Sequence, residues 1–313
     1  MGSCPPHIWG LMWGFEGHEH IGQRGLHYGV VMHSHHHHQH DLNPDWAKMV
    51  ADITLEGEVV MPYVTETVPS IAALCRQDGL AVRRVIDVGS GPGVGTCVLA
   101  QQFDDADVVA VDGSKEMLER AEARADALGL SGRVRTQQAE IPAGLAGLGH
   151  AELVWMAMVL HHVDDPAAAL RGLRSILEPN GLLAIAEFGD PSQFLPDDAG
   201  PPGFRERLGD FNPADVFPSF DYPALIEAAG FDLLVDRMVE VRLDPPLAEG
   251  ARRVARRYLQ RMLDLVGERL DAQDRATLDM LLDEEAPLGL MRRPDAFLVV
   301  SRRIYVARAA PTG

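Results

Sequence analysis

The chain has 313 residues, of which 46% are hydrophobic and 24% charged, as in an ordinary globular protein large enough to bury a core. Its 46 acidic and 28 basic side chains give a formal net charge of −18, which repels polyanions and argues against a nucleic-acid partner. The longest apolar run, Leu153 to Leu160, falls far short of the roughly 20 residues of a membrane span, so no membrane association is predicted. No secretory signal is visible, and three scattered cysteines suit neither a disulfide framework nor a tetrahedral metal site, so a cytoplasmic location is predicted.

Residues 1–40 hold ten of the thirteen histidines and show no helical or strand periodicity, so we expect a poorly ordered tail. Its densest part, MHSHHHHQHD from Met32 to Asp41, can bind zinc, nickel or copper through neutral imidazoles. A solvated tail, a tag left from expression and an extension upstream of a true start at Met32 are the open alternatives. Because such a tract lacks fixed geometry, no metal site is predicted.

Ordered structure is expected to begin at Asn43-Pro44, a helix N-cap followed by proline at the first helical position. Apolar residues then recur at helical spacing in two segments that end before Gly79. Residues 41–80 are therefore predicted to form an N-terminal helical cap that acts as a lid.

From residue 81 onward, short strand patterns alternate with helical patterns. This alternation predicts a parallel sheet covered by helices on both faces. We expect an α/β fold in residues 81–313, a doubly wound Rossmann-like sheet of seven mostly parallel strands. The strands are predicted at 83–88, 107–112, 133–137, 151–158, 181–188, 231–241 and 296–308.

Two segments interrupt this alternation. Residues 190–220 are rich in Pro, Gly and Phe and too long for a simple connector, so a functional lid loop is predicted. Residues 246–285 are amphipathic and are predicted to insert two helices before the last strand.

The segment VIDVGSGPGVGTCVLA, Val85 to Ala100, places four glycines at alternate positions directly after a β-branched strand. In a doubly wound sheet the first strand-to-helix turn meets the ligand, and glycine lets the backbone come close because it has no Cβ. Asp112 ends the second strand, where a carboxylate can accept both hydroxyls of a ribose. These features predict a cofactor that contains a nucleoside.

The dinucleotide fingerprint GxGxxG fails in every register, because its third glycine falls on Val94, Thr96 or Val98. NAD and FAD are therefore disfavoured.

The pattern Asp87-x-Gly89-x-Gly91-x-Gly93 resembles motif I of the class I S-adenosylmethionine-dependent methyltransferases. The resemblance extends from about residue 80 to 190. It includes DGS (112–114), QAE (138–140), ELVWMAMVLHHVDDP (152–166) and LEPNGLLAIAE (177–187), where Asn180 replaces the first glycine of the family's L-x-P-G-G.

The resemblance implies S-adenosylmethionine as cofactor. The glycine turn would cradle its methionine part, Asp87 would approach its amino group, and Asp112 would hold its ribose. Glu140 would lie near the adenine amine, and the end of the fourth strand would line the sulfonium side. The cofactor contacts so implied are Asp87, Gly89, Ser90, Gly91, Gly93, Asp112, Gly113, Ser114, Ala139, Glu140, Met156, Ala157 and Met158.

Methyl transfer from a sulfonium is an in-line displacement, and a general base is needed only when the acceptor loses a proton. His161 and His162, after the fourth strand, and Glu187, at the end of the fifth, are the candidate catalytic residues. For each of them a structural role stays open, as hydrogen bonding or capping of the following loop.

Aromatic side chains from the cap and the long loop are predicted to wall the acceptor site, with core packing as the alternative. They suggest an apolar or aromatic small molecule as methyl acceptor. The residues predicted to line this site are Trp46, Tyr63, Phe194 and Phe204, with Phe211, Phe217 and Phe220 as further candidates.

The sequence thus predicts a methyltransferase that acts on a small molecule. Two alternatives are a protein that binds S-adenosylmethionine without methyl transfer, as a sensor or structural module, and a metal-handling protein that uses the histidine tail. The acceptor atom and the oligomeric state, a homodimer included, stay open.

Overall fold

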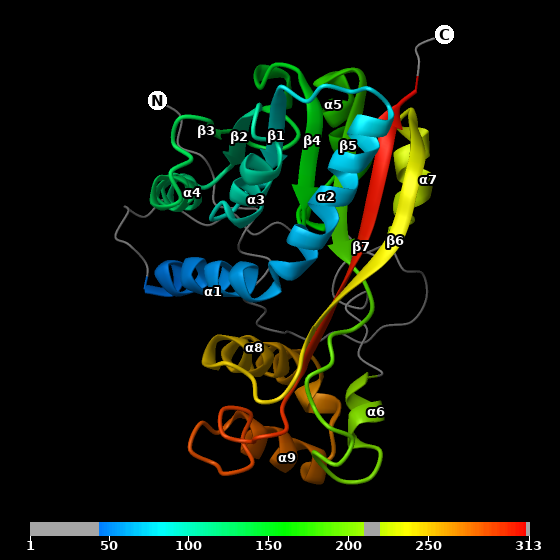
Figure 1. Ribbon diagram of the computed structural model, residues 1–313. Coiled ribbons are helices and arrows are strands. Elements are labelled where there is room, and N and C mark those ends of the chain that lie inside the picture. Colours follow the sequence, from blue (N-terminus) through cyan, green and yellow to red (C-terminus); the bar gives the residue numbers. More distant parts are fainter. Residues whose placement is uncertain (1–43, 210–219, 311–313) are drawn as a thin grey trace, which may run out of the picture. The chain divides into compact units, whose positions relative to one another are not determined.

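The computed structural model describes residues 44–209 and 220–310, and for residues 44–47 only the backbone (Figure 1). The chain divides after Ala47, and the features below lie in the unit Lys48–Gly313. The histidine-rich tail, the side chain of Trp46, and Phe211 and Phe217 lie outside the described residues. None of the described helices is long and apolar enough to cross a membrane.

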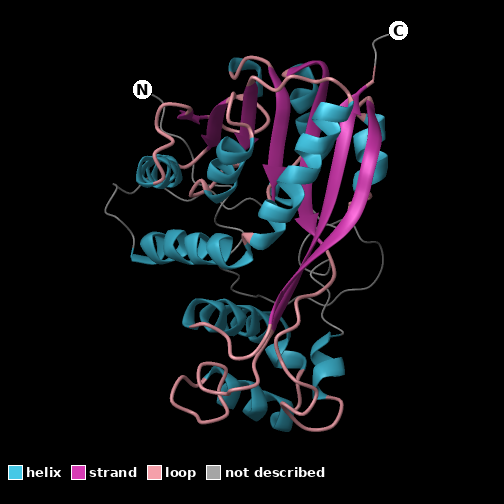
Figure 2. Cartoon of the chain, in the orientation of Figure 1, coloured by secondary structure: helices cyan, strands magenta, loops and turns pink. Residues whose placement is uncertain are grey.

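Seven strands form one sheet in the order β3-β2-β1-β4-β5-β7-β6 (Figures 1 and 2). Of these seven strands, β7 alone runs in the direction opposite to the other six, so the predicted seven-stranded, mostly parallel sheet is confirmed. The chain crosses from β3 to β4 on the other side of β1, and a ligand is expected at this switch point. The strands are β1 (Arg84–Val88), β2 (Asp107–Asp112), β3 (Val134–Gln138), β4 (Ala151–Ala157), β5 (Leu177–Phe188), β6 (Phe231–Leu243) and β7 (Leu298–Ala309).

Two hydrophobic cores cover the two faces of the sheet. Alternate strand residues supply them, because successive side chains of a strand point to opposite faces: Val85 joins one core and Ile86 the other. The first core packs under α2 (Pro62–Gln77) and α3 (Val94–Gln102), with α4 (Lys115–Ala127) on the same face. The second packs under α5 (Pro166–Ser175) and α7 (Tyr222–Ala228).

The cap and the insertion have the predicted helices. The cap consists of α1 (Pro44–Val60) and α2, and residues 246–285 contain α8 (Glu249–Val266) and α9 (Ala272–Leu282). The strands β6 and β7 stay paired as far as Leu243 and Leu298, well beyond the end of β5, and the insertion packs on these ends (Figure 1). The insertion and the α2 face of the sheet therefore share one continuous core.

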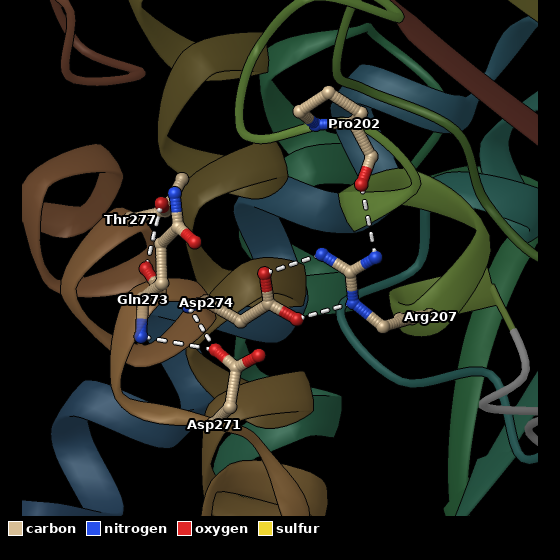
Figure 3. A network of polar contacts seen from close by, with 6 residues as sticks. All are labelled: Pro202, Arg207, Asp271, Gln273, Asp274 and Thr277. Atoms are coloured by element: carbon tan, nitrogen blue, oxygen red, sulfur yellow. Dashed lines mark hydrogen bonds and ion pairs between the residues drawn. The ribbon is translucent and has the colours of Figure 1, made fainter.

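An ion pair ties the 190–209 segment to the insertion (Figure 3). Arg207, in α6 (Phe204–Gly209), donates from Nε and Nη2 to the two carboxylate oxygens of Asp274 in α9, at 2.5 and 2.7 Å. Asp271 caps α9 by accepting from the backbone N–H groups of Gln273 and Asp274. The hydrogen bonds from Arg207 hold the pKa of Asp274 below its ordinary value.

The substitution Asp274→Asn should lower the melting temperature at pH 7, because Arg207 loses its two charged acceptors. Since the folded pKa of Asp274 lies below its unfolded value, its contribution is present above the unfolded pKa and is lost as the pH falls through the folded one. Thermal unfolding of both proteins from pH 7 to pH 3 checks this. A gap in melting temperature that stays constant down to pH 3 would contradict the ion-pair account.

Candidate cofactor-binding site

The three glycines of the first turn differ in their surroundings. All have positive φ, at 70° for Gly89, 51° for Gly91 and 76° for Gly93, which L side chains rarely adopt. A Cβ on Gly89 would lie 2.2 Å from Val159, and one on Gly93 would lie 2.7 Å from the Cβ of Ala121. A Cβ on Gly91 would meet nothing within 4 Å. Gly89 and Gly93 therefore permit close packing, whereas Gly91 borders the open space where a ligand can come close.

Asp112, at the end of β2, fixes the position of this turn. Its Oδ2 accepts from the backbone N–H of Gly91 at 2.9 Å, and its Oδ1 accepts from that of Ser114 at 2.9 Å. The carboxylate thereby joins the glycine turn to the N-terminus of α4, where Ser114 is the N-cap and accepts from the N–H of Met117. Each oxygen keeps a lone pair for a further donor, such as a ribose hydroxyl.

Asp87, at the turn end of β1, is a second buried carboxylate, and its Oδ2 accepts from the hydroxyl of Thr96 at 2.6 Å. Burial raises the pKa of Asp87 to about 7. The hydrogen bond from Thr96 opposes this rise, and the negative charge of Asp112 adds to it. Burial likewise raises the pKa of Asp112 to about 6, although hydrogen bonds from Ser114 and Gly91 oppose it. The free site thus holds two carboxylates that a cationic or hydroxyl-bearing ligand would help to ionise.

The segment after β3 borders the Asp112 side of the site. A Cβ on Gly113 would lie 3.1 Å from a carboxylate oxygen of Glu140, so the Glu140 side chain reaches the β2 end. The N–H of Ala139 donates to the Asp112 carbonyl at 3.1 Å, and Gln138 donates to the Gly113 carbonyl at 2.7 Å. The residues predicted to flank ribose and adenine are therefore neighbours, although they come from two strands.

The end of β4 supplies the residues predicted to line the sulfonium side. Met156 is fully buried in the core on the α5 face, so packing already accounts for its side chain. Ala157 and Met158 are only half-buried, and Met158 has a φ of 59° with its N–H bonded to the Ala186 carbonyl. The role of these three residues toward a cofactor stays a prediction.

His161 and Glu187 form a buried pair. Glu187 accepts from the N–H of Leu160 at 2.8 Å through Oε1 and contacts His161 Nδ1 at 2.6 Å through Oε2. These bonds fix the turn after β4 on the end of β5. The ring centroid of His162 lies 3.8 Å from that of His161, and burial lowers the pKa of His162 to about 3, with a smaller effect from His161. His162 is therefore neutral at neutral pH.

The aromatic candidates fall into two groups. Tyr63 is buried on α2, and its ring centroid lies 5.8 Å from the guanidinium carbon of Arg302 on β7. Phe194 and Phe204 are buried in the core shared with the insertion, and the ring centroid of Phe194 lies 6.4 Å from that of Tyr258. Their burial is that of core residues, and their contact with an acceptor stays a prediction.

Some residues of the site escaped the sequence analysis. Thr96, the partner of Asp87, was hidden in the glycine turn, where a hydroxyl has no pattern of its own. Arg302 on β7 had a visible signal: it lies in phase with Val300, Ile304 and Val306, on the buried side of a strand. A cation at such a position marks a buried polar site.

The arrangement fits a nucleoside with a cationic amino-acid tail. The open space at Gly91 leaves room for it, and the carboxylates of Asp87 and Asp112 complement an ammonium group and ribose hydroxyls. The buried hydroxyl of Ser90 has no hydrogen-bond partner among the described residues and is available to the same ligand. The described residues include no group of three His, Cys, Asp or Glu side chains suited to a metal ion.

Comparisons with known proteins agree with this arrangement. Residues 85–181 match the family model described as "Methyltransferase domain". The chain is 32% identical over 141 residues to a trans-aconitate 2-methyltransferase of Methylobacterium radiotolerans, covering 44% of this chain and 48% of that protein. It is 29% identical over 161 residues to a ubiquinone biosynthesis O-methyltransferase of Psychrobacter arcticus, covering 50% and 57%.

The matches are partial, since the chain spans about half the length of these two curated relatives. Among solved structures, the YcgJ protein of Bacillus subtilis aligns over 74% of this chain and 94% of its own, with 17% identity and a TM-score of 0.46.

The fold and the turn are those of a nucleoside-binding α/β protein. Residues 85–181 match a methyltransferase domain, and this match confirms the resemblance to the class I S-adenosylmethionine-dependent methyltransferases seen in the sequence. S-adenosylmethionine is the methyl donor of this class.

Substituting individual glycines should separate binding from folding. Gly91→Ala should weaken binding of S-adenosylhomocysteine at least tenfold, because its methyl group enters the space at the turn. Gly93→Ala should mainly destabilise the fold, by roughly 1–3 kcal/mol, because its Cβ overlaps Ala121. Calorimetry and thermal unfolding measure the two effects.

Gly129→Ala is the matched control, since Gly129 also has a φ of 70° and nothing within 4 Å of its Cβ position but lies after α4. This variant measures only the loss of stability caused by a positive φ at a residue other than glycine. Equal cofactor affinity in the Gly91 and Gly129 variants would show that the ligand does not approach the turn.

Cofactor affinity should depend on pH. Asp87 and Asp112, with pKa values of about 7 and about 6, are largely protonated at pH 5.5, and the cofactor's ammonium and hydroxyl groups favour the ionised forms. We expect affinity for S-adenosylhomocysteine to rise by roughly tenfold or more from pH 5.5 to 7.5. Asp87→Asn should flatten the rise, and Asp107→Asn, at the exposed start of β2, should not.

The stability of the free protein should change in the opposite direction. Both folded pKa values exceed the ordinary 3.8. The stabilisation that these two carboxyl groups give the folded protein is therefore complete below pH 3.8 and is lost as the pH rises through about 7. Calorimetry at several pH values, with unfolding measured separately, checks both trends. An affinity independent of pH would contradict the roles given to the two carboxylates.

Proposed function

We propose that this chain transfers the methyl group of S-adenosylmethionine to a small-molecule acceptor. The observation that carries the proposal is the turn at Gly91, open to a ligand and held by the Asp112 carboxylate, within a matched methyltransferase domain. The relatives' names support a small acceptor, because one acts on trans-aconitate and another in ubiquinone biosynthesis. The net charge of −18 argues against nucleic acid as the acceptor.

The residues of the turn would bind and orient the cofactor. Gly89, Ser90, Gly91 and Gly93 would hold its amino-acid part, Asp87 its ammonium group, and Asp112 its ribose. S-adenosylmethionine supplies a methyl group activated by positive sulfur, together with a neutral thioether as leaving group. The protein's main contribution is then alignment and exclusion of water at the ends of β4 and β5.

His161 and Glu187 would act as positioning residues, because their bonds with each other and with the Leu160 N–H fix the turn after β4. His162, with a pKa of about 3, is a weak base. This favours an acceptor that needs no strong base for its deprotonation.

The cap and the insertion would form the lid of the acceptor site. Glu56 of α1 binds Arg257 and Tyr258 of α8, so the two helices are joined by buried polar contacts. The cytoplasmic location and the oligomeric state stay predictions from sequence.

The test is formation of S-adenosylhomocysteine by the purified protein over a panel of phenols, amines and carboxylic acids, followed by mass spectrometry. We expect product with at least one acceptor. Binding of S-adenosylmethionine without turnover over the whole panel would favour the binding-only alternative.

Asp112→Ala should weaken cofactor binding at least tenfold, since it removes the ribose acceptor and frees the Gly91 N–H. Asp107→Ala is the control, because Asp107 lies on the same strand but is exposed. Calorimetry with S-adenosylhomocysteine measures both variants. Parental affinity in Asp112→Ala would mean that the site is misplaced.

A further inference from the structure

Arg302 is a buried cation whose environment accounts for only part of its hydrogen-bonding capacity. Its side chain is 4% exposed, on the face of β7 that otherwise presents Ile304 and Val306 to the core. A guanidinium stays protonated and offers five N–H donors. Burying such a group is costly unless its donors find acceptors.

The protein provides few acceptors for Arg302. Nη1 donates to the neighbouring Ser301 carbonyl at 3.1 Å, and the phenol of Tyr258 is a second hydrogen-bond partner of the guanidinium. Nε has no partner among the described residues. The carboxylate of Glu56 stands 3.8 Å from Nη2, beyond hydrogen-bond distance.

Glu56 is already shared with other groups. It accepts from the Tyr258 hydroxyl at 2.7 Å, and it pairs with Arg257 and, at 3.6 Å, with Arg261. The carboxylate of Glu56 thus contacts several donors, and its contact with Arg302, at 3.8 Å, is the longest of them.

The guanidinium of Arg302 lies beside the predicted site of methyl transfer. It stacks 5.7 Å from the ring centroid of Phe188, its cross-strand partner at the end of β5, and 5.8 Å from that of Tyr63. The Phe188 ring lies 4.6 Å from that of His161, which holds the turn after β4. The two aromatic rings shield the cation from water and leave its planar edge as the means of contact with a ligand.

We propose that Arg302 binds a carboxylate of the methyl acceptor, so that the substrates are small carboxylic acids. The inference rests on the proposed function and specifies its acceptor. A guanidinium edge matches a carboxylate in a two-bond geometry. A dianionic phosphate fits less well, because the single positive charge of Arg302 would leave its second negative charge uncompensated, whereas Arg257 and Arg261 are already paired with Glu56.

Calorimetry on the complex with S-adenosylhomocysteine tests this. The probes are benzoate, 4-hydroxybenzoate and succinate, each compared with its carboxamide, and phenyl phosphate. At least one carboxylate should bind ten times more tightly than its carboxamide and than phenyl phosphate. Arg302→Met should abolish that preference, and Arg302→Lys should restore part of it.

Arg303→Met is the matched control. Arg303 is the next residue, its side chain is 43% exposed, and it pairs with Asp236 on β6 instead. This variant should keep the carboxylate preference. Binding of S-adenosylhomocysteine to each variant verifies folding and tests the proposed function by itself.

The outcomes are distinguishable. The proposal is overturned if carboxamides or phenyl phosphate bind as well as carboxylates, if Arg302→Met keeps the preference, or if no carboxylate binds to a protein that does bind S-adenosylhomocysteine. If Arg302→Met fails to bind S-adenosylhomocysteine, Arg302→Lys and the carboxamide comparison on the parent protein decide. Loss of S-adenosylhomocysteine binding in the parent would instead overturn the proposed function.

Discussion

The bridge that the Asp112 carboxylate makes between two backbone N–H groups is the constraint on which the site depends. One N–H belongs to Gly91 in the turn after β1, and the other to Ser114 at the start of α4. A positive φ at Gly91 gives the turn its shape, and the bridge holds that shape in one position. The same carboxylate keeps lone pairs for a ligand, so one group both builds the site and can bind in it.

The neighbouring strand ends are fixed by a similar arrangement. Glu187, at the end of β5, binds the N–H of Leu160 and the ring of His161, and so orders the turn after β4. Arg302 reaches this region from β7, which is antiparallel to β5 and therefore enters from the opposite direction. In the proposed site, the cofactor side would thus be built from backbone and carboxylates, and the acceptor side from aromatic rings and a guanidinium.

Local sequence patterns predicted most of the fold. The alternation of strand and helix led to the sheet, and Pro44 marked the start of α1, because caps and apolar spacing act within a few residues. The paired length of β6 and β7 and the core they share with the insertion could not be predicted. They depend on contacts between segments far apart in the chain.

As with the fold, the sequence predicts residues of the site but not the contacts between them. The sequence predicts Gly91 and Asp112 as cofactor contacts, whereas the hydrogen bond between them depends on the register of β1 against β2. Met156 shows what a linear pattern leaves out, since alternation along β4 turns its side chain into the core, while its contact with a cofactor stays a prediction. The position of Glu56 near Arg302 brings together α1 and β7, nearly the whole length of the fold apart in sequence.

A crystal structure of the protein with S-adenosylhomocysteine is the most direct measurement. The account predicts the ribose hydroxyls within hydrogen-bond distance of the Asp112 carboxylate and the amino-acid end against the backbone of Gly89 to Gly93. A nucleoside bound elsewhere, or bound at the turn without contact to Asp112, would contradict it.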